Sequence, residues 1–214
     1  MAFGATFVND SGAAVIDGTY KNMGLRVKQE FAVGAGGVYA VTIYNAVAPI
    51  LFINCTGYAG FYRVVESGST FTFYIKAASG GVCTAYIFDV PAPTVSTYGM
   101  VVKNAAGVTI FNTESNYLRI VDFFGVYGSP NTPGYFPSYT RTYPSGKYAV
   151  AIGVPRTRYP YNEQGYVDGI NTTATAINLV SNVPVLTAEQ ALVGTSAIRD
   201  GFTTYAMTAN VTGY

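Results

Sequence analysis

The stretch FGATFVNDSGAAVIDGTYKNMGLRV (residues 3–27) is repeated in outline by YGMVVKNAAGVTIFNTESNYLRI (residues 98–120). Each begins with an aromatic residue and glycine, continues through an Asn-x-x-Gly turn and an apolar strand, and ends on Leu-Arg followed by a β-branched residue. The period of about 95 residues is the size of a small domain. We therefore predict two tandem β-sandwich domains, residues 1–93 and 94–214, divided at the Pro91-Ala92-Pro93 sequence.

The remaining sequence predicts an all-β fold. Aromatic and polar residues alternate in TFTFYIK (70–76), as is typical of a half-buried strand. Further strands are expected at VYAVTIYN (38–45), PILFINC (49–55), GFYRVV (60–65), VCTAYIFDV (82–90), KYAVAIGV (147–154) and within residues 201–214. KYAVAIGV stands in the second copy where PILFINC stands in the first. One short helix is expected at 187–194, where Thr187 can cap the start and Gly194 can end it.

The composition excludes several classes of function. Charged residues are 11% of the chain and the net charge is +1, so the chain has no basic stripe for nucleic acid. Low charge together with 19 Tyr and 13 Phe indicates surfaces that lie against other protein. No apolar run approaches the roughly 20 residues of a membrane span, so membrane insertion is not expected. MAFGATFVND at the start lacks the features of a signal peptide, so we expect synthesis and folding in a cytosol.

The two cysteines, Cys55 and Cys83, both fall in apolar strand-like segments. We expect two buried free thiols that act as small hydrophobic side chains, because a disulfide would require an oxidising setting. The chain contains no His, which removes the commonest metal ligand and general base. We therefore expect no metal site and no cofactor.

Two stretches of the second copy, residues 128–146 and 155–170, are rich in Pro, Gly and Tyr and are predicted to be exposed loop insertions. Tyr and Arg are enriched at binding hot spots, and Tyr also suits the face and edge of a sugar ring. The candidate residues for binding a partner or glycan are Tyr135, Tyr139, Arg141, Tyr143, Arg156, Arg158, Tyr159 and Tyr161. The alternative is that these side chains pack on their own domain or on a neighbouring subunit.

Two further sets of charged residues are candidates for a structural or catalytic role. Arg26 and Arg119 occupy equivalent positions of the repeat and are predicted to have an assembly or structural role, as ion pairs with acids such as Glu30 and Asp122 or as a repeated partner contact. Glu163 and Asp168 are the one carboxylate pair that could suit a glycosidase, but nothing in their spacing indicates catalytic geometry. With no nucleophile or phosphate-binding motif either, we predict a protein that is not an enzyme and has no catalytic residues.

The pattern Tyr98-Gly99, Asn104, Gly107, Ile110-Phe111-Asn112 and Tyr117-Leu118-Arg119-Ile120-Val121 resembles small β-rich tail proteins of tailed bacteriophages. The match covers about 30 residues in each copy. The resemblance implies a virion protein of the tail tip, baseplate or fibre, synthesised in the cytoplasm of the host bacterium. Its partners would then be other tail proteins, copies of itself and a host surface polysaccharide or receptor.

Three alternatives stay open at this point. A receptor- or glycan-binding protein would use the Tyr/Arg loops. A capsid-decorating protein would share the β fold and the low charge. A glycoside-cleaving enzyme would use Glu163 and Asp168.

Overall fold

The computed structural model describes residues 7–8, 14–16, 22–77, 80–90, 99–104, 106–126, 139–153, 157–158, 165–185 and 204–214. Every regular element in these ranges is a β-strand, which confirms the all-β prediction. The ranges hold no helix long and apolar enough to cross a membrane. The helix expected at 187–194 lies outside the described residues.

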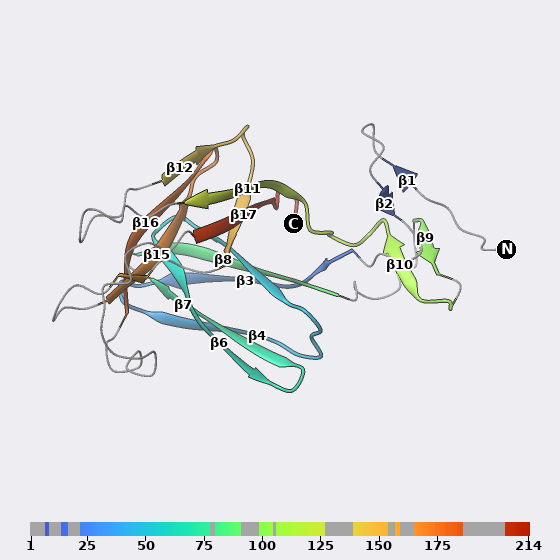
Figure 1. Ribbon diagram of the computed structural model, residues 1–214, viewed down its shortest axis with the longest axis horizontal. Helices are drawn as coiled ribbons and strands as arrows, with labels where there is room; N and C mark the ends of the chain where they lie inside the picture. The colour runs from blue at the N-terminus through green and yellow to red at the C-terminus, as the bar shows by residue number, and fades with distance from the viewer. Residues whose placement is uncertain are drawn as a thin grey trace.

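Two antiparallel sheets contain most of the strands (Figure 1). The six-stranded sheet has the order β11 (Ile120–Val126), β17 (Thr204–Asn210), β13 (Tyr148–Ile152), β5 (Ile50–Cys55), β8 (Gly81–Asp89), β3 (Gly24–Val33). The seven-stranded sheet has the order β12 (Tyr139–Thr142), β16 (Ala176–Val185), β15 (Gly165–Thr172), β6 (Ala59–Ser67), β7 (Thr70–Ala77), β4 (Val38–Ile43), and β14 (Thr157–Arg158) also pairs with β15.

Two small hairpins stand apart from these sheets. They are β1 (Phe7–Val8) with β2 (Ala14–Ile16), and β9 (Val101–Lys103) with β10 (Thr109–Asn112). Figure 1 shows both hairpins at the same end of the molecule. Their strands flank the two Asn-x-x-Gly motifs of the sequence repeat. In the second hairpin the Asn104 side chain accepts hydrogen bonds from the backbone N–H groups of Ala106 and Val108, at 3.1 and 2.9 Å.

The two halves of the chain contribute to each large sheet in the same order. From the outer edge to the middle, the first half supplies β3, β8 and β5 to one sheet, and the second half supplies β11, β17 and β13. The other sheet repeats this arrangement with β4, β7 and β6 against β12, β16 and β15. The halves meet where Ile53 lies opposite Val150, and where Ala59 lies opposite Ile170.

This pairing joins the two halves along both sheets. The predicted boundary at 91–93 lies outside the described residues, so the division into two tandem domains stays a prediction. The strand positions predicted within the first half agree with β4 to β8 to within a few residues.

Apolar side chains from both sheets form one core, as in a two-layer sandwich. The six-stranded sheet contributes Ile53, Ile87 and Val150, and the seven-stranded sheet contributes Val41 and Ile75. All five side chains are buried, and burying one such side chain contributes about 1.5–3 kcal/mol. Strand β5 alternates between two environments: Leu51, Ile53 and Cys55 belong to this core, whereas Ile50 and Phe52 face the other side of the sheet.

A second cluster lies on that other side of the six-stranded sheet. Phe52, Tyr86 and Phe88 are fully buried there. The rings of Phe52 and Phe88 meet edge to face with centroids 5.6 Å apart. The six-stranded sheet is therefore apolar on both faces, which explains why its central strands read as nearly continuous hydrophobic runs.

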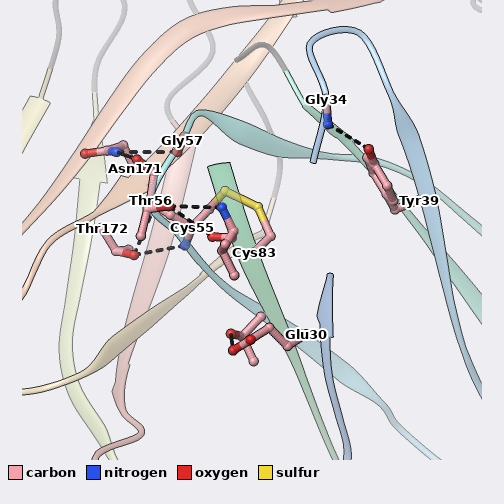
Figure 2. The surroundings of a disulfide bond; sticks show 11 residues. Glu30, Gly34, Tyr39, Cys55, Thr56, Gly57, Cys83, Asn171 and Thr172 are labelled. Carbon is pink, nitrogen blue, oxygen red and sulfur yellow. Dashed lines mark hydrogen bonds between the residues drawn. A yellow bond between two sulfur atoms is a disulfide. The ribbon is translucent and has the colours of Figure 1, made fainter. Parts of the chain in front are cut away.

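The expectation of free thiols is wrong, because Cys55 and Cys83 form a disulfide. The two residues lie directly opposite each other on β5 and β8, and both are fully buried. Thr172 of β15 donates its hydroxyl to the Cys55 carbonyl at 3.2 Å and accepts from the Cys55 N–H at 2.9 Å, as Figure 2 shows. Asn171 donates to the Thr56 carbonyl at 2.7 Å. The second half of the chain therefore holds the first half beside the disulfide.

The predicted loop insertions are also partly wrong. Residues 139–142 form strand β12, and residues 165–170 belong to strand β15. β12 forms because Thr140 and Thr142 suit a strand and because β16 offers it an in-register partner, with Thr140 opposite Asn178. The Pro- and Gly-rich parts at 128–138, 155–156 and 159–164 lie outside the described residues.

Candidate functional site

Two of the predicted binding residues, Tyr139 and Arg141, lie at the edge strand β12 and contact β11. The Tyr139 ring stacks on the buried ring of Phe124 with centroids 5.1 Å apart. The Arg141 guanidinium lies 5.4 Å from the centre of the Phe124 ring. Its Nε is 3.4 Å from the Oδ2 of Asp122. This ion pair neutralises Arg141 and holds it against the aromatic pair.

Tyr143, a third predicted residue, points inward from the end of β12. Its hydroxyl donates to Asp122 at 3.0 Å and shares a hydrogen bond of 3.0 Å with the hydroxyl of Thr208. Its ring stacks on Tyr148 at 4.8 Å. Burial raises the pKa of Tyr143 to about 12, and the hydrogen bond to the Asp122 carboxylate acts in the same direction. Tyr143 is therefore a neutral donor at physiological pH.

These contacts favour the packing interpretation for Tyr139 and Tyr143. Both rings are half-buried and pack against the main core. Tyr135, Arg156, Tyr159, Tyr161 and Glu163, together with the side chains of Arg158 and Asp168, lie outside the described parts, so a binding role of the loops stays a prediction.

Arg26 is held by a buried carboxylate, but not by the one that the sequence suggested. Its Nη1 is 3.4 Å from the Oδ2 of Asp89, which is fully buried at the end of β8. Asp89 also accepts the backbone N–H groups of Val47 and Ala48 at 3.1 and 2.7 Å. Glu30 lies four residues along the strand from Arg26, about 13 Å away. It accepts a hydrogen bond from Thr84 instead.

Arg119 occupies the equivalent place in the second half, and its partners differ. Its Nε donates to the Tyr214 hydroxyl at 2.7 Å and its Nη2 donates to the Thr212 carbonyl at 3.0 Å. The guanidinium lies over the Tyr214 ring, 4.5 Å from its centre. The suggested pairing with Asp122 is wrong, because Asp122 turns toward Arg141 and Tyr143. Arg119 forms no ion pair within the described residues.

The sequence analysis missed an exposed apolar surface on the edge strand β11. Ile120, Val121 and Phe123 are 50%, 49% and 62% exposed. Phe123 stacks in nearly parallel fashion on Tyr205 of β17, which is 50% exposed, with centroids 5.8 Å apart. We call these four residues the β11 surface. The partial signal in the sequence is the run IVDFF at 120–124, in which the exposed Val121 and Phe123 alternate with the half-buried Asp122 and the buried Phe124.

The edge strand in the equivalent place of the first half is different. Strand β3 presents Lys28, Gln29 and Glu30 to solvent. Charged residues on an edge strand discourage pairing with another chain. Of the two outer edges of the six-stranded sheet, β3 is thus protected and β11 is apolar.

Comparison of the chain with protein-family models, with curated proteins and with solved structures produced no match.

Proposed function

We propose that this chain is a non-enzymatic structural component of a tailed-bacteriophage virion, in the tail-tip or baseplate region, where it binds a neighbouring subunit through the β11 surface. The observation that carries the proposal is the exposed, apolar edge strand with its stacked Phe123–Tyr205 pair. The resemblance of the repeated hairpin and Leu-Arg strand to phage tail proteins supplies the biological setting.

The chemistry of the β11 surface suits a protein partner. An edge strand offers unpaired backbone N–H and C=O groups to an incoming strand, and its side chains offer apolar contacts on alternate faces. Large aromatic side chains at such edges are typical hot spots. The low charge of the whole chain lowers the electrostatic cost of packing many subunits together.

The matching strand order of the two halves supports an internal duplication, because one duplication accounts for the same path through two sheets in both halves. After duplication, one edge kept charged residues and the other became apolar. A subunit whose β3 edge is charged and whose β11 edge is apolar would bind its neighbour through the β11 edge only, which fixes its orientation in an assembly.

The disulfide fits the same setting. Disulfides persist in oxidising surroundings, and a virion released by lysis of its host enters such surroundings. The Cys55–Cys83 bond would then raise the stability of a subunit that, in a released virion, is no longer renewed by synthesis.

The test is incorporation of Phe123→Lys into particles made in cells that express this gene in its native context. A lysine placed in an apolar contact loses its hydration without gaining a partner, so we expect incorporation to fall by at least about tenfold. Val65→Lys is the matched control, because Val65 is a similarly exposed apolar residue on β6. Circular dichroism of the purified variants would establish that both are folded.

Normal incorporation of folded Phe123→Lys would refute the role of the β11 surface. Electron microscopy of a tagged wild-type subunit tests the location independently. Label at the tail tip supports the proposal, label on the head replaces it with capsid decoration, and absence from particles overturns the virion assignment.

A further inference from the structure

We propose that the pocket around Arg119 binds the carboxylate of an acidic sugar. The pocket has a volume of about 240 Å³ and is lined by Ser115, Asn116, Tyr117, Arg119 and Tyr214. It lies where the segment leading into β11 meets the end of the chain. It shares no residue with the β11 surface, so this inference stands independently of the assembly function proposed above.

The comparison of the two equivalent arginines carries the argument. Arg26 is neutralised by Asp89, a buried carboxylate that also binds two backbone N–H groups. At Arg119 the corresponding contacts are the Thr212 carbonyl and the Tyr214 hydroxyl, both uncharged. The second half thus keeps the arginine without an internal counter-ion among the described residues, and an external anion can take that place.

Several polar groups of the lining residues have no partner within the described residues. Nε and Nη2 of Arg119 have protein partners, whereas Nη1 has none in the described structure. The side chains of Ser115 and Asn116 likewise make no hydrogen bond within the described residues. One guanidinium nitrogen, one hydroxyl and one amide without a described partner therefore belong to residues that line the same small space.

The aromatic walls are held rigidly before any ligand binds. The Tyr214 hydroxyl donates to the Tyr117 carbonyl while it accepts from Arg119. The Tyr117 ring stacks on Phe111 with centroids 5.0 Å apart, and its hydroxyl accepts the Asn112 N–H at 2.7 Å. A preorganised pocket loses little conformational entropy on binding, which favours even a small ligand.

These groups specify the class of ligand. Arginine binds carboxylates through charge-assisted hydrogen bonds. Serine and asparagine side chains suit hydroxyl groups, and tyrosine rings offer apolar walls to the C–H faces of a sugar. The volume is below the roughly 300–1,000 Å³ of pockets for drug-sized ligands, so it fits a single sugar residue. A uronic acid combines all of these features.

The experiment is an NMR titration of the full chain with glucuronate, following the Arg119 Nε–H and the ring signals of Tyr117 and Tyr214. We expect saturable shifts with glucuronate and at least tenfold weaker binding of glucose and of N-acetylglutamate. Equal binding of glucose would overturn the role of the carboxylate. Equal binding of N-acetylglutamate would overturn the assignment to a sugar. It would mean that a carboxylate alone is recognised, as on an acidic side chain of a protein, without any contribution from the sugar ring.

Two variants localise the site. Asn116→Asp places a carboxylate in the lining beside Arg119, where it repels the glucuronate carboxylate and competes with it for the guanidinium, so it should weaken glucuronate binding at least tenfold. The Asn116 side chain has no described contact whose loss would affect the fold. Arg119→Gln should also abolish binding. Arg63→Gln is the matched control, because Arg63 is another exposed arginine that stacks on a tyrosine, Tyr74, at 4.4 Å. Unchanged binding in folded Asn116→Asp would refute the proposal.

Discussion

Reduction of the Cys55–Cys83 disulfide should lower the stability of the protein by a predictable amount. The bond joins residues separated by 28 positions on the adjacent strands β5 and β8. The loop-entropy model gives a contribution of about 3.5 kcal/mol at 25 °C for a loop of this length. The 214-residue chain has an entropy of unfolding of about 0.45 kcal/mol/K. The expected decrease in Tm is therefore about 8 °C.

The measurement is differential scanning calorimetry of the oxidised and the reduced protein at one pH, with free thiols counted after alkylation in denaturant. Reduction is the cleaner perturbation, since both sulfur atoms stay in the core. Cys55→Ala/Cys83→Ala is the control, and its Tm should not respond to reductant. An unchanged Tm in fully reduced wild-type protein would refute the reasoning. It would mean that the disulfide does not lower the conformational entropy of the unfolded chain.

Three further predictions follow from particular contacts. Asp89→Ala should cost about 1–3 kcal/mol in urea denaturation, because it leaves Arg26 and the backbone N–H groups of Val47 and Ala48 without their acceptor. A cost below about 0.5 kcal/mol would contradict this role. Burial raises the pKa of Tyr143 to about 12 in the folded state, above the ordinary value of 10.0 expected in the unfolded state, so its contribution to stability is present below pH 10 and is lost as the pH rises toward 12. Tyr143→Phe should therefore lose less stability than the wild type over this interval, and equal losses would contradict the pKa shift. Ile53→Ala should cost about 2–5 kcal/mol, because the side chain is buried. It should shift a single calorimetric transition, because Ile53 lies opposite Val150 where the halves join. Two transitions, of which only one shifts, would instead support independent domains.

The sequence predicted those features that depend on neighbouring residues. Alternation in TFTFYIK placed β7, and the apolar runs around Cys55 and Cys83 placed β5 and β8, because a strand buried on one or both faces must carry such patterns. The two Asn-x-x-Gly motifs lie between paired strands, β1 with β2 and β9 with β10, because such a motif favours a chain reversal. Strand β12 was missed, since its weak local pattern is stabilised by pairing with β16.

The candidate site depended more strongly on distant residues. The sequence identified Arg26 and Arg119 as equivalent, but it suggested acids within four residues of each. Asp89 lies 63 positions from Arg26, and Tyr214 lies 95 positions from Arg119. The β11 surface required knowledge that β11 is an edge strand, which is a property of the sheet order.

The sequence alone thus determined the all-β class, most strand positions and the equivalence of two stretches, because hydrophobic alternation and turn chemistry act over a few residues. The tertiary structure decided which strands pair, that the two cysteines face each other, and that one repeated arginine has an internal carboxylate while the other does not. These outcomes rest on long-range packing, in which residues far apart in the chain share one low-dielectric environment and must satisfy one another's charge and hydrogen bonds.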